Sequence, residues 1–247
     1  MVISNKLNKL VGFGILLFGI FGSIALAQEK PDKSAIIARL QQHYWDRVKL
    51  FEEENQSFKK VVLLGDSITE GFKVDQYFPG RPFINRGIVA DGIGVNTTGI
   101  LYRLDNSVFD CNPSHIFILI GINDLAAGRS QDTILRVYRE VLTRIQTRLP
   151  KVKVYITSVL PCRGKYAHLN PLVLEFNAKL QPLAAEFKYT YFDLYSIMKD
   201  EKGELREEWT ADGLHLKPPA YEVWKKEIDR LLGVTATVTT IGKDTTK

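Results

Sequence analysis

Five short apolar runs alternate with amphipathic stretches along this chain, and the alternation limits the folds that it can adopt. Short runs of branched and aromatic residues are typical of buried strands, and a three-to-four residue spacing is typical of helices. We expect strands at Lys60–Leu64, Pro82–Asn85, His115–Ile120, Lys153–Val159 and Thr190–Phe192. We expect helices at Lys33–Asn55, directly after Ser67, and at Asn96–Val108, Ser130–Arg148, Asn170–Phe187 and Pro218–Leu232. This order predicts an α/β protein whose parallel sheet is covered on both faces.

The first 27 residues form a separate segment. Lys6 and Lys9 precede an apolar run that ends in Ala-Leu-Ala at residues 25–27, the small-x-small pattern of a signal-peptidase site. We therefore expect cleavage after Ala27 and a secreted or periplasmic mature protein. The alternative is an uncleaved N-terminal membrane anchor, because residues 10–27 are just long enough to be considered for one. After cleavage, we expect no stable membrane insertion.

The remaining chain is expected to be one domain at residues 28–233, followed by a threonine-rich flexible tail at 234–247. The full sequence is 45% hydrophobic, which suits one well-buried domain. Its net charge is +5, and removal of Lys6 and Lys9 leaves +3. The basic residues are scattered among acidic ones, so we expect no nucleic-acid partner. The sequence does not indicate the oligomeric state.

The two cysteines are expected to remain unpaired. Cys111 precedes one predicted strand and Cys162 follows the next, so they would lie at opposite ends of a parallel sheet. Six residues at about 3.3 Å each separate such ends by roughly 20 Å, which is beyond disulfide reach. Two cysteines also provide no metal cluster, and we expect neither a metal site nor a cofactor.

Ligands of open parallel sheets bind outside the carboxyl ends of the strands, which gives a test for each candidate residue. Ser67 meets it, because it comes two residues after the first predicted strand in the segment Gly65-Asp66-Ser67. A serine at this point can be a helix N-cap or a nucleophile near amide groups that favour negative charge. A nucleophilic serine also needs a base that a third group orients.

His215 is the best candidate base among the four histidines. Asp212 precedes it by three residues, and Gly213 makes the intervening bend easy. The aspartate could therefore hold the imidazole, although a turn with a surface histidine has the same pattern. The other histidines lie on the first helix (His43), at the amino end of a strand (His115) and in a loop as a possible substrate contact (His168).

Two further residues could supply donors to the oxyanion of an acyl-transfer reaction. Asn123 follows the third predicted strand and can donate through its side chain, and Gly87 follows the second and can donate through its N–H. Each could also be an ordinary loop residue. Three other carboxylates near strand ends are rivals to Asp212, namely Asp66, Asp124 and Asp193. Tyr77, Phe78, Tyr166 and Trp209 could line a sugar platform or pack in the core.

Four blocks in this order are similar to those of the SGNH hydrolase superfamily, also called GDSL esterases or lipases. The blocks are "GDSIT" from Gly65, "NRGI" from Asn85, "GIND" from Gly121 and "DGLH" from Asp212. The stretches "YRLDNSV" and "DGLHLKPPAYEVW" resemble the branch that contains platelet-activating-factor acetylhydrolase subunits and bacterial carbohydrate acetylesterases. Two departures are a longer segment after Gly87 and "LKPPAY" in place of Ser-x-x-Gly-Tyr after the histidine.

The resemblance implies a three-layer α/β/α sandwich with a flavodoxin-like five-stranded parallel sheet. It also implies a metal-free mechanism with a catalytic triad of Ser67, His215 and Asp212. The oxyanion hole would consist of the Ser67 and Gly87 amides and the Asn123 side chain.

The function that we expect is that of an exported esterase that acts on a small-molecule or carbohydrate ester, with acetyl as the favoured acyl group. The alternatives are a lysophospholipase or thioesterase, acyl transfer to a sugar, and a non-catalytic carbohydrate-binding domain.

Overall fold

The structure is a computed structural model that describes residues 32–55, 61–95 and 98–234. The predicted signal segment, and the predicted tail from residue 235 onward, lie outside these residues. The strands are β1 (Val61–Gly65), β2 (Phe83–Gly87), β3 (His115–Leu119), β4 (Lys153–Thr157) and β5 (Thr190–Phe192). The α-helices are α1 (Lys33–Glu54), α2 (Ser67–Glu70), α3 (Val74–Tyr77), α4 (Ile122–Ala126), α5 (Gln131–Arg148), α6 (Asn170–Glu186), α7 (Tyr195–Met198) and α8 (Pro218–Leu231). Short 3₁₀ or π-helical turns are η1 (Ile100–Arg103), η2 (Asp105–Phe109), η3 (Gly164–Leu169) and η4 (Glu207–Trp209).

The five strands form one parallel sheet in the order β2-β1-β3-β4-β5, which confirms the predicted class. The register places Gly65 of β1 level with Gly87 of β2 and Leu119 of β3. The chain therefore leaves these three strands at one height on one edge of the sheet. The residues that follow them are brought together there.

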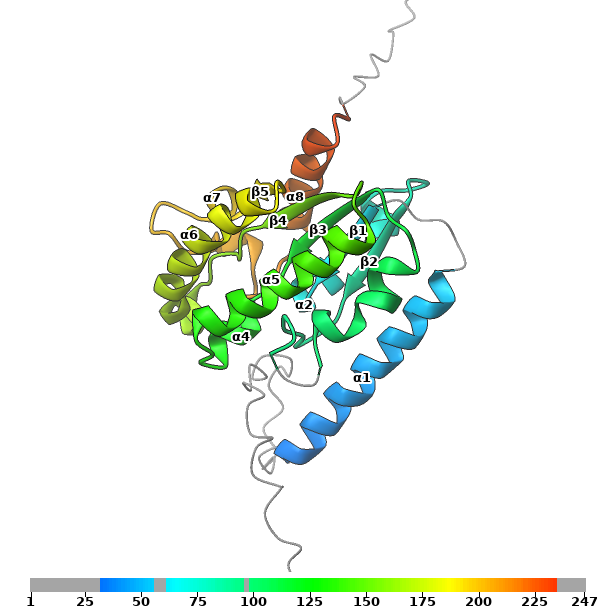
Figure 1. The fold of residues 1–247 in the computed structure, drawn as a ribbon. Helices are drawn as coiled ribbons and strands as arrows, with labels where there is room; N and C mark the ends of the chain where they lie inside the picture. Colours follow the sequence, from blue (N-terminus) through cyan, green and yellow to red (C-terminus); the bar gives the residue numbers. More distant parts are fainter. Residues whose placement is uncertain (1–31, 56–60, 96–97, 235–247) are drawn as a thin grey trace, which may run out of the picture.

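Helices cover both faces of the sheet (Figure 1). Alternate strand residues point to opposite faces, as they must in a pleated sheet. On one face, Val62, Ile116 and Ile156 belong to a core that includes residues of α5 and α6. On the other face, Leu63 and Phe117 belong to a core that includes residues of α2, α3, α7 and α8. The fold is therefore the expected α/β/α sandwich.

Helix α1 lies outside both layers, beside the edge strand β2 (Figure 1). It buries Tyr44, Val48 and Phe51, which cluster with Ile88 just after β2. These positions are spaced by three or four residues, so they form the apolar stripe that the sequence predicted.

Arg47 of α1 covers the open edge of the sheet. Its guanidinium donates to the main-chain oxygens of Asn85 (3.4 Å) and Gly87 (3.2 Å). An edge strand otherwise leaves such carbonyls without partners, which favours pairing with another chain.

One local prediction was wrong. The described part of the predicted helix at Asn96–Val108 is a 3₁₀ turn that begins at Ile100 and continues into the π-helical turn η2. The residue before it, Gly99, has a φ of 124°, a left-handed conformation that ends any continuous helix at this point. Helix α6 continues past Pro182 to Glu186, so this proline does not end the helix.

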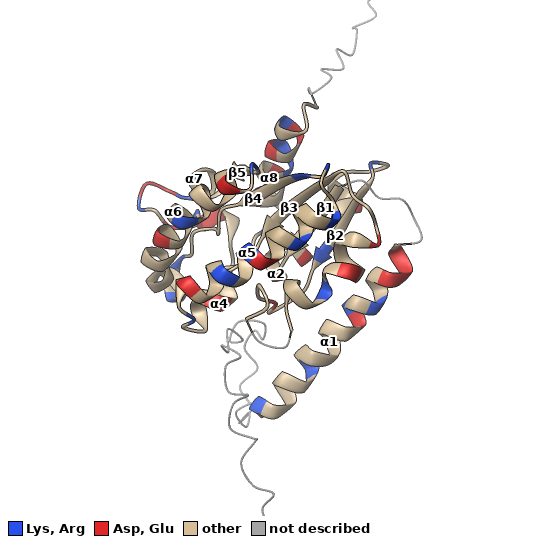
Figure 2. Cartoon of the chain, viewed as in Figure 1, with Lys and Arg blue, Asp and Glu red and all other residues tan. Residues whose placement is uncertain are grey.

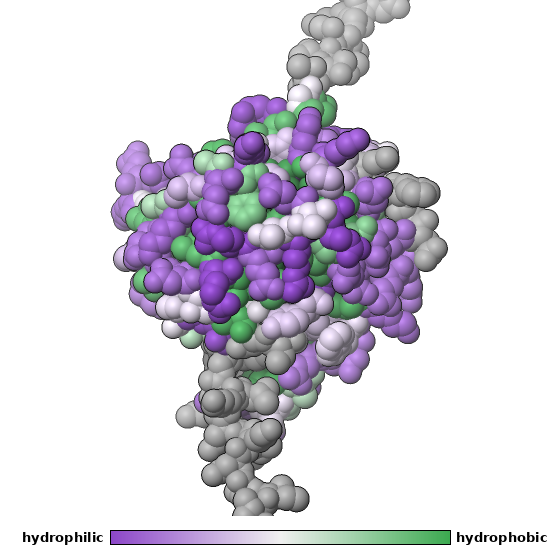
Figure 3. Space-filling model, in the orientation of Figure 1, coloured by the Kyte–Doolittle hydropathy of each residue, from purple (hydrophilic) through white to green (hydrophobic). Residues whose placement is uncertain are grey.

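Acidic and basic residues are interspersed over the elements of the chain (Figure 2), and the visible face is mostly hydrophilic (Figure 3). Cys111 and Cys162 are both buried and unpaired, as expected. Among the described residues, no helix combines the length and apolar composition needed to cross a bilayer.

Phe72→Ala is expected to lower the free energy of unfolding by about 3–5 kcal/mol, as for other buried aromatic residues. Phe72 is fully buried, and its ring stacks on Tyr221 and Trp224 at centroid distances of 5.2 and 5.0 Å. Urea unfolding would measure the change. Tyr102→Ala is the control, because this side chain is exposed and its loss should cost less than about 0.5 kcal/mol. Equal effects of the two substitutions would contradict the predicted role of Phe72 in the core.

Candidate active site

Ser67 is the first residue of α2 and lies two residues beyond the end of β1. The turn between them is tight, because a Cβ on Gly65 would lie 2.2 Å from Oγ1 of Thr69 in α2. The N-cap is Asp66, whose side chain accepts from the Ile68 N–H at 3.0 Å. The alternative of Ser67 as the cap is therefore wrong. Its hydroxyl remains available for another interaction.

The hydroxyl of Ser67 contacts His215. The distance from Nε2 of His215 to Oγ of Ser67 is 3.0 Å. On the other side of the ring, Nδ1 lies 2.7 Å from Oδ2 of Asp212. A neutral imidazole held in this way donates from Nδ1 to the carboxylate and accepts from the serine through Nε2. The three side chains thus have the order of nucleophile, base and orienting acid.

The loop before α8 fixes Asp212 and His215. Oδ1 of Asp212 accepts from the N–H groups of Leu214 (2.9 Å) and His215 (2.8 Å), while Oδ2 meets the imidazole. Gly213 has a φ of 91°, and a Cβ there would lie 2.2 Å from the Arg163 carbonyl oxygen. Only glycine fits this bend without displacing the backbone.

The pKa of Asp212 is lowered from its ordinary value. Partial burial acts to raise the pKa, but the hydrogen bonds from the His215 side chain and from the Leu214 and His215 amides outweigh it. Asp212 therefore stays ionised at neutral pH, which suits a group that orients an imidazole and stabilises its protonated form.

Asn123 lies in the first turn of α4, which begins directly after β3. Its Nδ2 donates to the Asp91 main-chain oxygen at 2.8 Å. An amide nitrogen carries two hydrogens, so one remains for a further acceptor. The structure therefore links Asn123 to the segment that follows β2.

Gly87 occupies a closely packed position at the end of β2. A Cβ there would lie 2.1 Å from the Glu70 nitrogen, so glycine allows β2 to pack against α2. The Gly87 N–H donates to Oδ1 of Asn85 at 2.8 Å. Donation to a substrate would require this bond to open, and the oxyanion role of Gly87 stays a prediction. Ser67 differs, because the first N–H groups of a helix have no acceptor within it.

The sequence predictions missed a buried ion pair beneath these residues. The Arg103 guanidinium lies 2.8 Å from the Asp91 carboxylate, and both side chains are 1% exposed. Arg103 also donates to the Gly65 carbonyl oxygen at 3.0 Å. Asp91 comes four residues after β2, a position that the strand-end rule could have identified. Arg103 follows no strand and gave no comparable signal.

Three buried carboxyls surround the start of α2. The pKa of Asp66 is raised to about 7, above all by burial; the charges of Asp91 and Asp124 also act to raise it, and the hydrogen bond from the Ile68 N–H acts to lower it. Burial likewise raises the pKa of Asp91 and of Asp124 to about 6 each. At neutral pH, Asp66 is therefore partly protonated. This lowers the negative charge on the residue that directly precedes Ser67.

The other candidates lie elsewhere or in the core. His43 contacts Glu70, His115 contacts Ser114, and His168 is exposed on η3. Among the sugar-platform candidates, Tyr77, Phe78 and Tyr166 are buried in the two cores. Within the described ranges, no three His, Cys, Asp or Glu side chains are grouped so as to hold a metal ion.

Trp209 remains partly exposed in η4. Its main-chain oxygen accepts from the Lys217 N–H at 2.8 Å, so it lies beside the strand-like bridge that Thr210 and Leu216 form around His215.

Comparison with known families and proteins identifies the family of this chain. A model of the GDSL-like lipase/acylhydrolase family matches residues 63–223. An Escherichia coli O18:K1:H7 protein named N-acylneuraminate cytidylyltransferase is 24% identical over 208 residues, which cover 83% of this chain and 47% of that protein. The chain thus spans about half the length of this curated relative.

Solved structures share the fold. A Streptococcus pneumoniae structure named for platelet activating factor has a TM-score of 0.74 at 22% identity, covering 81% of this chain and 97% of that one. A GDSL-like lipase from Bacteroides thetaiotaomicron has a TM-score of 0.64 at 23% identity, covering 79% of this chain and 98% of that one. A catalytic mutant of an acetylxylan esterase from Geobacillus stearothermophilus has a TM-score of 0.60 at 15% identity, covering 72% of this chain and 96% of that one.

Asp66→Asn is expected to stabilise the protein progressively as the pH rises. The pKa of Asp66 is about 7 in the folded protein and about 3.9 in an unfolded chain. The folded state thus binds more protons between these values, and the wild type loses stability as the pH rises through them. From pH 5 to pH 8, the unfolding free energy of the variant should rise by roughly 1–3 kcal/mol relative to the wild type. Urea unfolding at both pH values would test this, and a constant difference would contradict it.

Proposed function

Since the chain belongs to the GDSL-like lipase/acylhydrolase family and is a carboxylic-ester hydrolase, we propose that it removes short acyl groups, above all acetyl, from carbohydrates or similar polar alcohols. We further propose that Ser67, His215 and Asp212 are its catalytic triad. The observation that carries this proposal is the pair of contacts made by the imidazole, 3.0 Å to Oγ of Ser67 and 2.7 Å to Oδ2 of Asp212.

In the first half of the proposed reaction, Oγ of Ser67 attacks the ester carbonyl carbon while Nε2 of His215 takes the hydroxyl proton. The carbonyl oxygen becomes an oxyanion, for which the donors would be the Ser67 and Gly87 N–H groups and the Asn123 side chain. Preorganised donors stabilise such a charge without reorganisation during the reaction. Asp212 holds the imidazole and stabilises its protonated form.

In the second half, the protonated Nε2 gives its proton to the leaving alcohol, and the carbon–oxygen bond of the ester breaks. Ser67 then carries the acyl group. His215 next takes a proton from water, whose oxygen attacks the acyl-enzyme. This attack forms a second intermediate. Its breakdown returns the proton to Oγ of Ser67 and releases the carboxylic acid.

The substrate preference rests on two observations. The sequence blocks resemble the branch that includes carbohydrate acetylesterases, and one protein with this fold is named an acetylxylan esterase. Trp209 is the one sugar-platform candidate that is only partly buried; it packs against the core and lies three residues before Asp212. Aromatic rings of this kind can pack against apolar faces of a sugar. Export is proposed from the pattern of residues 1–27.

Hydrolysis of p-nitrophenyl esters from acetyl to decanoyl by the mature protein tests the proposal. We expect turnover to be confined to the acetyl and propionyl esters and to fall by at least about 10³-fold in Ser67→Ala, since the nucleophile is lost. Ser196→Ala is the matched control, because this serine is exposed and lies at the start of α7. Measuring kcat/KM for each ester separates chain-length preference from overall loss.

A rise of kcat/KM toward octanoyl would instead support the lysophospholipase or thioesterase alternative. No Ser67-dependent turnover on any ester would overturn the proposed triad and support the carbohydrate-binding alternative. Acetyl release that requires an added sugar acceptor would indicate acyl transfer.

A further inference from the structure

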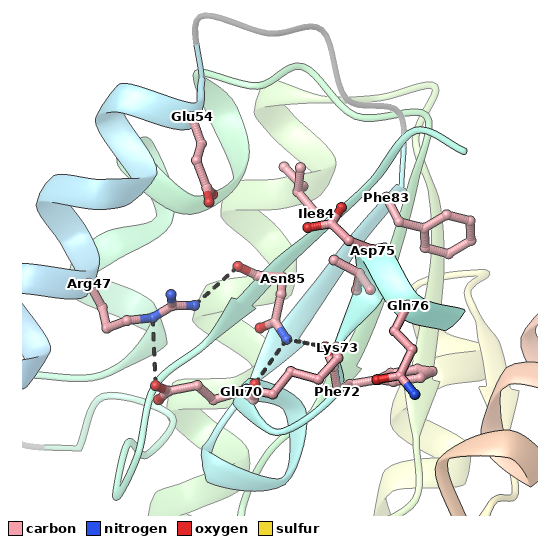
Figure 4. Close-up of a pocket in the computed structure, with 11 residues that line it drawn as sticks. Arg47, Glu54, Glu70, Phe72, Lys73, Asp75, Gln76, Phe83, Ile84 and Asn85 are labelled. Carbon is pink, nitrogen blue, oxygen red and sulfur yellow. Dashed lines mark hydrogen bonds and ion pairs between the residues drawn. The ribbon is translucent and has the colours of Figure 1, made fainter. Parts of the chain in front are cut away.

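The Glu70 carboxylate connects α1 to the segment that follows β2. Its Oε2 accepts from the Val89 N–H at 2.6 Å. Its Oε1 lies 3.0 Å from Nε2 of His43 and 3.9 Å from Nε of Arg47, both on α1. Figure 4 shows Arg47 reaching from α1 toward Glu70 and Asn85. One carboxylate thus joins three parts of the chain that are distant in sequence.

Glu70 lies in the same short helix as Ser67. The two residues are three positions apart, so their side chains leave neighbouring parts of the helix surface. Ser67 contacts His215 on one side. Glu70 contacts the segment after β2 on the other. Glu70 therefore restrains movement of Val89 relative to Ser67, in addition to the Ile88 N–H, which donates to the Gly65 oxygen at 3.2 Å.

The segment from Ile88 to Asp91 is a tight turn held at both ends. The Asp91 N–H donates to the Ile88 oxygen at 3.2 Å. Ala90 has a φ of 59°, a left-handed conformation that a residue with a Cβ rarely adopts. Glu70 fixes Val89 on one side of this residue, and Asn123 fixes the Asp91 oxygen on the other. Such a conformation persists when its surroundings determine it from several directions.

We propose that Glu70 is a positioning residue that holds the Ile88–Asp91 turn against Asn123, and that α1 supports it through His43 and Arg47. This inference rests on the proposed function, in which Asn123 and the end of β2 contribute oxyanion donors. Glu70 acts through the turn and touches neither the substrate nor the reacting atoms. The helix α1 thereby becomes part of the active-site support, although it precedes residues 63–223, which match the family.

Two features make α1 suitable for this role. Arg47 contacts Glu70, the side chain that holds the turn. It also donates to the oxygen of Gly87, the residue directly before the turn. The apolar residues of α1 pack on Ile88, the first residue of the turn. The helix therefore combines a charged contact with an apolar one at the same segment.

Glu70 can be substituted without opening a cavity in the core. It lies on the wall of a hollow of about 570 Å³ that Arg47, Lys73 and Asn85 also line (Figure 4). Water can fill the space that a shorter side chain leaves. Glu70→Ala removes the acceptor of the Val89 N–H. Glu70→Gln keeps an oxygen there but removes the charge.

We predict different effects for these two substitutions. In Glu70→Ala, amide hydrogen exchange over residues 86–95 should accelerate by about tenfold or more, since the turn opens locally. On p-nitrophenyl acetate, kcat should fall by about tenfold or more while KM changes by less than about threefold, because misplaced donors act on the transition state. Glu70→Gln should recover most of both losses. Glu186→Ala is the control, because this carboxylate forms an exposed pair with Arg139.

The contribution of α1 is tested by His43→Ala beside Gln42→Ala, its exposed neighbour on the same helix. Faster exchange over residues 86–95 in His43→Ala alone supports it, and equal exchange in the two variants overturns this part of the proposal.

Unchanged exchange and kcat in Glu70→Ala, with Ser67-dependent turnover intact, would overturn the role of Glu70 and leave the proposed function standing. Absence of Ser67-dependent turnover in the wild type would instead overturn the proposed function. The exchange rates alone would then decide whether Glu70 orders the turn.

Discussion

The parallel register of β2, β1 and β3 is the constraint on which the candidate site depends. Because Gly65, Gly87 and Leu119 are level, the chain leaves all three strands at one edge, and Ser67 and Asn123 follow within a few residues. A shift of one residue in this register would move each strand's side chains to the opposite face of the sheet and carry the site residues apart. The apolar residues on both faces therefore fix the site as well as the core.

Buried charge is the second constraint, and it explains the form of the segment after β2. Arg103 pairs with Asp91 and donates to the Gly65 oxygen, so one guanidinium joins that segment to the last residue of β1. Removing one partner of such a pair costs about 3–5 kcal/mol, since the other is left charged and buried. The pair thus opposes any rearrangement that would separate the segment after β2 from the strand that precedes Ser67.

The contacts of Ser67, His215 and Asp212 could be predicted from the sequence, because a local pattern identifies each of the three residues. A short tether joins Asp212 to His215, and the end of an apolar run precedes Ser67. The role of Arg103 could not be inferred in this way, because its partners are 12 and 38 residues away. The predicted helix at residues 96–108 was misjudged for a related reason. Its spacing suited a helix, but contacts with the core and the left-handed Gly99 determined the backbone.

The local sequence pattern was enough to locate Ser67, but it does not explain why helix α2 is stable. A helix of four residues cannot form alone in water, because nucleation costs more than so few bonds return. Its carbonyls are instead bonded from outside, with Asn85 donating to the Thr69 oxygen at 2.6 Å and the Glu70 oxygen at 3.3 Å. Tyr221 of α8 donates to the Ile68 oxygen at 2.8 Å. Helix α8 directly follows the loop of His215, so the helix next to the proposed base also holds the helix that carries the proposed nucleophile.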